Sequence, residues 1–133
     1  MKFTLETTQG ILIHAYQPGE VTLKLPSGDP TKPHSTKTYS SSLVLGQGDT
    51  PEDWPVSQIE ELALNHFDSV WCEKPDIVLL GTGERLVFPD KEIRQRFGLE
   101  GIGFEVMDTA AACRTYNVLV SEGRSIMSFL ILG

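Results

Sequence analysis

The amino-acid sequence predicts an α/β fold with parallel strands in its C-terminal half. The first observation is a strand–helix–strand pattern over residues 103–132. The second is the apolar run 77–80, which lacks alternation and is typical of a strand covered on both faces. The third is β structure before residue 26, which the N-terminal half adds to this core. Because strand–helix–strand units close as parallel crossovers, three parallel strands are expected in the C-terminal half.

Length and composition fit one globular domain over residues 1–133. The net charge of −7 argues against a nucleic-acid partner, because phosphates repel an acidic surface. Only Cys72 and Cys113 are present, so no disulfide framework is expected, and both are expected to be small buried residues in a reducing compartment. The N-terminus lacks the apolar region of a signal peptide, which predicts a cytoplasmic protein that does not span a membrane.

The N-terminal β structure is expected as two short strands with a turn between them. Residues 11–16 form the first strand, and residues 21–25 alternate with period two and form the second. Residues 26–36 hold several prolines and hydroxyl side chains and little that could be buried, so they are predicted to form a mobile loop. Residues 38–45 then resume an extended chain.

The segment that follows, residues 52–74, has two readings. Ser57 and Glu60 fit a capping box, and apolar residues at helical spacing favour one helix over 57–72. The alternative is an extended segment followed by a helix only over residues 64–72. Helix propensity does not decide between the two.

A short strand at 77–80 leads into the turn Gly81-Thr82-Gly83. Ligands of open parallel sheets bind at this end of the strands, but the glycine spacing matches neither a dinucleotide fingerprint nor a P-loop. A structural turn is therefore the favoured interpretation. A short helix is predicted over 91–97, with Gly98 and Gly101 ending it.

The C-terminal helix has a start and a stop signal. Asp108 is a suitable N-cap, because its carboxylate can accept a hydrogen bond from the first turn. The helix is expected over 110–122, and Gly123 stands where a left-handed residue would end it. The apolar residues 126–132 then predict the last strand, which is too short for a membrane span.

Four segments together resemble one known family, and they stand at residues 77–83, 101–109, 112–119 and 122–124. The chain resembles the Mth938-like domain-of-unknown-function family, which includes the mitochondrial complex I assembly factor and small bacterial proteins. The resemblance implies a three-layer α/β domain with a mixed central sheet and extra β structure at one side. It also favours the interrupted version of the 57–72 region. The resemblance implies no catalytic residues, and it links the eukaryotic members to assembly of a respiratory complex.

The first functional hypothesis is a non-enzymatic interaction or assembly module without a cofactor or metal. The sequence offers no nucleophile–base pair, and its three histidines lack ligand spacing. The partner would be another protein; the sequence specifies neither its identity nor the oligomeric state of this chain. Tyr16, Tyr39 and Trp54 are candidate surface residues for such a partner.

The alternative is a small-molecule or anion site between the glycine turn and the start of the last helix. Helix N-terminal N–H groups attract anions, and Thr82 and Thr109 offer hydroxyl groups. Asp108 opposes this reading, because an N-cap carboxylate already occupies the donors that an anion needs. The possible ligand or interaction site is Gly81, Thr82, Gly83, Asp108, Thr109, Arg114 and Asn117.

Two of these residues have simpler structural interpretations. Asn117 is expected to be buried and to bind backbone groups. Arg114 is expected to form an ion pair with Glu105 or Asp108. Because strand alternation directs Glu105 away from the side of Phe104, convergence of two carboxylates for acid–base catalysis is not expected, and an enzyme is the third hypothesis.

Overall fold

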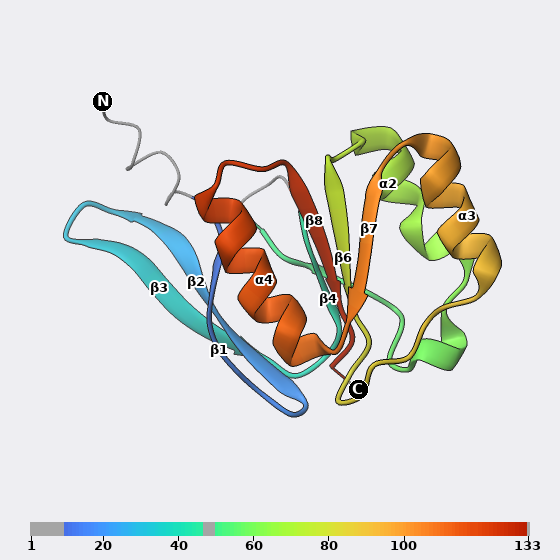
Figure 1. Cartoon of the computed structure of the whole chain (residues 1–133). Helices are drawn as coiled ribbons and strands as arrows, with labels where there is room; N and C mark the ends of the chain where they lie inside the picture. The colour runs from blue at the N-terminus through green and yellow to red at the C-terminus, as the bar shows by residue number, and fades with distance from the viewer. Residues whose placement is uncertain (1–9, 47–49, 133) are drawn as a thin grey trace.

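The computed structural model describes residues 10–46 and 50–132 of the chain. Its N-terminal part is a three-stranded antiparallel sheet in the order β1-β2-β3. The strands span Leu12–Gln17 for β1, Glu20–Asp29 for β2 and Lys32–Tyr39 for β3. This sheet extends to one side of the molecule in Figure 1. The two strands expected before residue 26 are thus confirmed.

The second sheet has five strands in the order β5-β4-β8-β6-β7. Its strands are β4 (Leu43–Leu45), β5 (Glu52–Asp53), β6 (Ile77–Gly81), β7 (Gly103–Met107) and β8 (Ile126–Leu130). β6 pairs in parallel with both β7 and β8, whereas β4 pairs antiparallel with β8. The expected parallel core and mixed sheet are therefore confirmed, and the β7–β8 connection crosses over β6.

Within the described residues, the helical elements begin with two short 3₁₀ turns, η1 (Ile59–Glu61) and η2 (Leu64–Phe67). Three α-helices follow, and they are α2 (Asp68–Glu73), α3 (Lys91–Glu100) and α4 (Thr109–Ser121). α4 packs against β6 and β8 on one side and against β1 on the other. In Figure 1, α4 therefore stands between the two sheets, while α2 and α3 lie at the other side.

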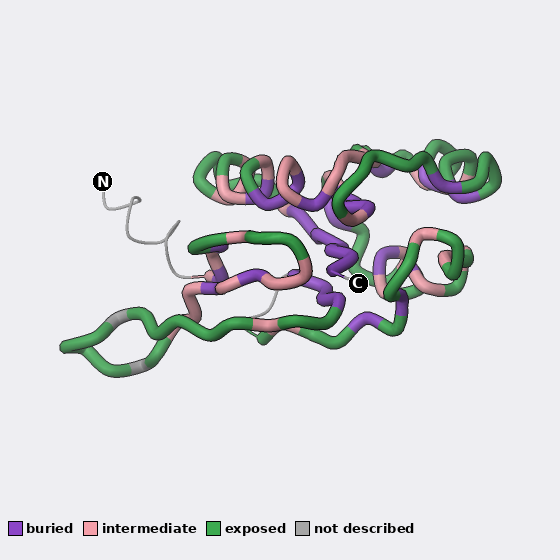
Figure 2. Tube along the Cα trace, turned by 90° about the horizontal axis from the view of Figure 1, so that it is seen from below, coloured by how far each residue is buried: buried purple, intermediate pink, exposed green. Residues whose placement is uncertain are grey.

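Two hydrophobic cores separate three layers. Side chains of β8 alternate between them, because Ile126 and Leu130 join the core under α4 and β1, and Met127 and Phe129 join the core under α2 and α3. The second core is rich in aromatic contacts, among them Phe67 against Phe129 at 4.9 Å between ring centroids. Figure 2 shows the buried residues gathered along the central sheet and exposed residues on the outer layers. The three-layer arrangement is thus confirmed.

The prediction of a loop over residues 26–36 was wrong. This stretch continues β2 and β3 as a hairpin, with Pro26 opposite His34 and Asp29 opposite Lys32. Asp29 closes the tip by accepting hydrogen bonds from the backbone N–H and the hydroxyl of Thr31, at 2.9 and 2.8 Å. Because β3 is an edge strand, a proline within it removes no ladder bond that a neighbour would need.

The ambiguous region follows the second reading. Residues 54–58 form no helix, a short 3₁₀ turn at η1 interrupts the segment that was expected to be extended, and η2 and α2 provide helical structure from Leu64 to Glu73. The capping pair is also different, because the N–H of Ser57 donates to the carboxylate of Glu61 at 2.9 Å, not to that of Glu60. Trp54 is buried and donates its indole N–H to the carbonyl of His66 at 3.1 Å, which holds the extended segment against the second core.

The predicted ends of the later helices are partly confirmed. α3 continues through Gly98 and ends at Gly101, so the end expected at residue 97 was wrong by one turn. α4 agrees with prediction, since Asp108 accepts a hydrogen bond from the N–H of Ala111 at 2.8 Å. Gly123 has a φ of +77°, as the expected stop residue requires.

Candidate functional site

The glycine turn at the end of β6 is shaped by close packing against α4. A Cβ atom at Gly81 would lie 2.9 Å from the Cα of Thr109 and 3.2 Å from the Cβ of Ala112. Only glycine therefore lets the start of α4 approach the strand this closely. The expected placement of both turns at one sheet edge is confirmed, because Gly81 pairs with Met107 in the parallel register.

Thr109 joins three segments at this edge. Its buried hydroxyl accepts a hydrogen bond from the N–H of Gly83 and donates one to the carbonyl of Ile131, each at 2.8 Å. Its own N–H donates to the carbonyl of Gly83 at 2.9 Å. Both polar groups of Thr109 are therefore bonded to backbone groups and stabilise the fold.

Thr82 and Asp108 are also engaged by backbone groups. The hydroxyl of Thr82 donates to the carbonyl of Arg85 at 2.5 Å and accepts from the N–H of Val87 at 3.2 Å. Asp108 caps α4 through the N–H of Ala111. The two bonds of Thr82 fix the conformation of the 82–87 turn. An anion at the start of α4 would have to compete with the Asp108 carboxylate for the N–H of Ala111.

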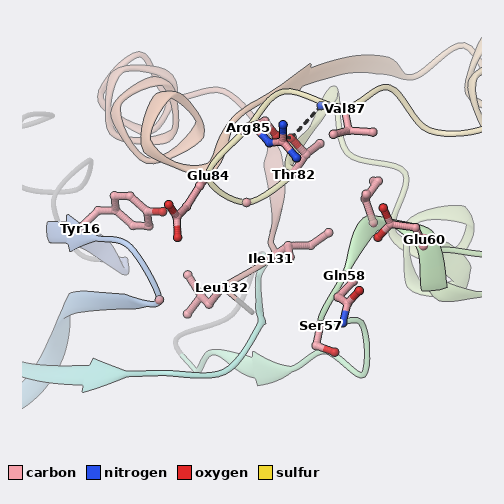
Figure 3. A pocket seen from close by; sticks show the side chains of 13 residues that line it. Tyr16, Ser57, Gln58, Glu60, Thr82, Glu84, Arg85, Val87, Ile131 and Leu132 are labelled. Atoms are coloured by element: carbon pink, nitrogen blue, oxygen red, sulfur yellow. Dashed lines mark hydrogen bonds between the residues drawn. The ribbon is translucent and has the colours of Figure 1, made fainter.

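A cleft of about 260 Å³ opens beside this turn (Figure 3). Four segments that are distant in sequence form its walls. They are the β1–β2 turn with Tyr16, residues 57–60, residues 82–87, and the chain end at Ile131 and Leu132. Of the seven predicted site residues, Thr82 and Gly83 line this cleft.

Charged side chains of both signs surround the cleft. Glu60 lies on one wall, and Glu84 and Arg85 lie on the turn opposite (Figure 3). The phenol of Tyr16 points toward the carboxylate of Glu84 in the same view. Burial raises the pKa of Tyr16, and the charge of Glu84 adds to the effect. Tyr16 therefore presents a neutral hydroxyl, which is a hydrogen-bond donor, at neutral pH.

Two of the other predicted residues, Arg114 and Asn117, face a separate depression of about 280 Å³ between β1 and α4, whereas Gly81, Asp108 and Thr109 line neither hollow. Asn117 and Arg114 line it together with Cys113. Asn117 is half-buried rather than buried, and its two bonds to the backbone of Ile13 confirm the expected role in binding backbone groups. Burial raises the pKa of Cys113 to about 12, so its sulfur is a thiol at neutral pH and a poor nucleophile.

Two expectations about charged and sulfur side chains were wrong. Both ion pairs found among residues 10–46 and 50–132 involve Glu100, whose partners are Lys74 and Arg96, so Arg114 is not paired with a carboxylate there. Arg114 is exposed, and water screens such a pair strongly. Cys72 was expected to be buried, but it is exposed on α2.

The surface feature that sequence reasoning missed is an exposed apolar segment after the glycine turn. The exposed fractions of Leu86, Val87 and Phe88 are 50%, 39% and 63%. Val87 lines the cleft, and both Val87 and Phe88 line a neighbouring cavity of about 170 Å³ that Ile59 shares. The three apolar residues are consecutive and follow the charged turn residues Glu84 and Arg85, a pattern that does not by itself indicate exposure.

The candidate interaction residues inferred from the sequence differ in how far they are buried. Trp54 is buried, so its proposed place on an interaction surface was wrong. Tyr16 and Tyr39 are half-buried and pack against the first core. Within the described part of the chain, no group of three or more His, Cys, Asp or Glu side chains is placed to hold a metal ion.

A family model described as protein of unknown function (DUF498/DUF598) matches residues 13–131. The chain belongs to this family. Membership in the DUF498/DUF598 family, together with the relatives below, confirms the resemblance inferred from the sequence.

Two curated relatives of this DUF498/DUF598 chain carry names that bear on function. The "13 kDa major membrane protein" of Francisella tularensis is 33% identical over 94 residues, which cover 70% of this chain and 76% of that protein. The human NADH dehydrogenase (ubiquinone) 1 alpha subcomplex assembly factor 3 is 35% identical over 80 residues, 59% of this chain. The match spans 44% of the human protein, less than half of its length.

Solved bacterial structures share the fold. An NMR structure of a Xanthomonas campestris protein has a TM-score of 0.75 and 32% identity, and the match covers 100% of this chain and 93% of that one. An NMR structure of a Bordetella pertussis protein, described as a Mth938-like domain, has a TM-score of 0.71 and 21% identity, with 94% and 87% covered. The Mth938-like fold expected for this DUF498/DUF598 member is therefore confirmed.

The Francisella tularensis relative is named a membrane protein. None of the helices in residues 10–46 and 50–132 combines the length and the apolar character needed to cross a bilayer.

Proposed function

We propose that this chain is a non-enzymatic protein-interaction module that takes part in assembling a larger complex. The observation that carries the proposal is the exposed apolar segment of Leu86, Val87 and Phe88, here called the apolar rim. Contiguous exposed apolar groups are costly in water and are typical of surfaces that another protein covers. The name of the human relative, an assembly factor, supports the same class of function.

The apolar rim is held in one conformation rather than presented on a loose loop. The N–H of Val87 donates to the hydroxyl of Thr82, and that hydroxyl donates to the carbonyl of Arg85. Pro89 follows directly and is buried. A surface fixed in advance loses less conformational entropy when a partner binds, which favours recognition.

Affinity purification with mild crosslinking tests the proposal. Soluble and membrane fractions are compared by mass spectrometry, using the natural chain and the double variant Val87→Ser/Phe88→Ser. Val118→Ser is the matched control, because Val118 is 54% exposed but lies on α4, away from the apolar rim. Enrichment of subunits of a multiprotein complex, lost only in the double variant, supports the proposal. Equal capture by all three chains, or capture of nothing but the chain itself, would contradict it.

A second candidate function is small-molecule binding in the cleft. Thr82 and Gly83 line it, and Arg85 places a positive charge beside them. Thermal shift with phosphate and with nucleotides tests this proposal. A ligand at about 100 times its Kd stabilises the protein by about 2.7 kcal/mol, which is measurable. An unchanged melting temperature, or a shift that persists in Arg85→Ala, would remove this candidate.

The cytoplasm is the location that we propose for this activity, and a respiratory complex is the assembly that the human relative suggests. Cell fractionation followed by immunodetection tests the location. Recovery in the soluble fraction after a high-salt wash of membranes is expected, and retention in washed membranes would contradict it.

A further inference from the structure

β7 is an edge strand of the five-stranded sheet, and it lies beside α3 (Figure 1). Within residues 10–46 and 50–132 it pairs only with β6. The N–H of Gly103 donates to Asp76 at 3.1 Å, and the carbonyl of Met107 accepts from Thr82 at 2.9 Å, so residues 103 and 107 face β6. Because peptide groups alternate along a strand, the N–H and carbonyl groups of Phe104 and Val106 point to the free edge.

The other edge strands have features that discourage the addition of a further strand, and β7 lacks these features. β3 carries Lys32, Pro33 and Lys37, and charged and proline residues discourage pairing at an edge. β5 has only two residues, and the edge of β1 is occupied by α4, because Asn117 bonds to the N–H and the carbonyl of Ile13. β7 has five residues, among which Glu105 is the single charge and no proline occurs. β7 is therefore the border best suited to accept another strand.

A groove of about 380 Å³ runs along this free edge. The three consecutive β7 residues 104–106 line it, and since their side chains alternate in direction, the groove follows the border of the strand rather than one face. Phe97 and Arg94 of α3 form the opposite wall. Phe88 of the apolar rim is 63% exposed and also lines the groove, so the groove continues the surface proposed above for a partner.

The two sides of β7 differ in chemistry. Phe104 and Val106 pack against the second core, whereas Met107 packs against the first. Glu105 shares the side of Met107, and it is exposed. A strand added at this border would therefore meet apolar groups on one of its sides and a carboxylate on the other.

We propose that β7 binds an extended segment of a partner protein as a sixth, antiparallel strand. The segment carries apolar side chains at alternate positions, which enter the groove, and a Lys or Arg between them, which faces Glu105. Main-chain hydrogen bonds to Phe104 and Val106 supply affinity, and the alternating side chains supply specificity. This inference rests on the proposed interaction function and names the chemistry of the partner.

A basic partner fits this border better than a second copy of the chain. In a symmetric antiparallel pairing centred on Glu105, the two Glu105 carboxylates would stand directly opposite one another, and like charges at such positions are destabilising. Two copies would also bring together net charges of −7 each. A segment with a positive residue instead gains an opposite-charge pair.

The test uses a capped synthetic peptide, Thr-Val-Lys-Val-Lys-Val-Thr, and three controls. One control peptide has Glu in place of both Lys, and another has N-methylated valines, which keep the side chains but cannot donate main-chain hydrogen bonds. Glu105→Lys reverses the charge at the border, and Glu92→Lys makes the same charge change on the exposed first turn of α3. Affinities are measured by fluorescence anisotropy, and amide exchange is followed by NMR.

The natural chain is expected to bind the lysine peptide and to slow amide exchange at Phe104 and Val106 about tenfold, with Glu105 as the reference that already bonds to β6. Glu105→Lys weakens lysine-peptide binding about three- to tenfold and reverses the preference between the charged peptides, whereas Glu92→Lys does not. Equal binding of the N-methylated peptide, unchanged exchange at both amides, or self-association that Glu105→Lys abolishes would overturn the proposal. If the peptide experiments contradict strand addition while partner capture still depends on the apolar rim, the interaction function stands and only the strand-addition inference is wrong.

Discussion

Asn117 of α4 and Ile13 of β1 form two complementary hydrogen bonds across 104 residues of sequence. The side-chain oxygen of Asn117 accepts from the N–H of Ile13 at 2.9 Å, and its amide nitrogen donates to the carbonyl of Ile13 at 2.7 Å. The hydroxyl of Tyr116 donates to the carbonyl of Ile11 at 2.9 Å on the same side of the helix. These bonds replace the missing strand partner of β1 and attach the three-stranded sheet to α4.

Replacing Asn117 with Ala is expected to lower the free energy of unfolding by about 2 kcal/mol. The change leaves a backbone N–H and a carbonyl of Ile13 without their partners, and unsatisfied groups of this kind cost about 1–3 kcal/mol. Urea denaturation measures the loss. Arg114→Ala is the control, because Arg114 is exposed on the same helix, and its effect should stay within about 0.5 kcal/mol. Equal losses in both variants would show that the Asn117 contact does not stabilise the fold.

Gly81→Ala and Gly98→Ala should change stability in opposite directions. The new Cβ at position 81 would meet the backbone of Thr109 at 2.9 Å, so overpacking should destabilise the protein by about 1–3 kcal/mol. At position 98 no atom lies within 4 Å of the new Cβ, and alanine in α3 should stabilise by about 0.5–1 kcal/mol. Thermal denaturation of both variants measures the two shifts. A neutral Gly81→Ala would mean that the approach of α4 to β6 can relax.

Two buried hydroxyls provide a second matched comparison. Thr109→Val removes the hydroxyl that bridges Gly83 and Ile131, and should cost about 1–3 kcal/mol, whereas Thr109→Ser should recover part of the loss. The hydroxyl of Ser128 is buried without a hydrogen-bond partner in the described structure, so Ser128→Ala should leave stability unchanged or raise it by up to about 1 kcal/mol. Chemical denaturation decides, and a large loss in Ser128→Ala would reveal a partner for that hydroxyl.

The two thiols should differ in reactivity. Cys72 is exposed, whereas Cys113 is buried and its pKa is raised to about 12 by burial, so at pH 8 its thiolate fraction is negligible. An aromatic disulfide reagent at pH 8 should therefore label one thiol per native chain rapidly and two after denaturation. Cys72→Ser should abolish the fast reaction. Rapid labelling of that variant would place Cys113 at the surface.

The C-terminal half could be predicted because its signals are local. Asp108 and Gly123 mark the two ends of α4 by chemistry that depends on neighbouring residues only, and the run at 77–80 is apolar on both faces because helices cover both. The expected course of the last crossover follows from the same signals.

The errors concern properties that depend on distant parts of the chain. Residues 26–36 read as a loop because prolines and hydroxyls dominate, yet an edge position makes a proline harmless, and edge positions are set by the whole sheet. The end of α3 was misplaced because Gly98 is tolerated where the helix meets solvent. Propensity alone cannot distinguish a helix-ending glycine from an internal one.

The sequence predicted that the glycine turn and the start of α4 lie together, but it did not predict how their polar groups are used. Gly81, Thr82, Gly83, Asp108 and Thr109 do meet at one sheet edge, but the two hydroxyls and the carboxylate bond to backbone groups. The apolar rim went unrecognised because exposure of an apolar residue is a tertiary property that local sequence does not encode. Trp54 was misassigned to the surface for the same reason.

Site-specific photo-crosslinking tests the central claim most directly, namely that the apolar rim meets a protein partner. p-Benzoylphenylalanine is introduced at position 88 and, as the matched control, at position 118, and cells are irradiated before lysis. The interaction function predicts discrete crosslinked products that hold a second protein at position 88 and none at position 118. Products of equal yield at both positions, or none at position 88, would contradict it.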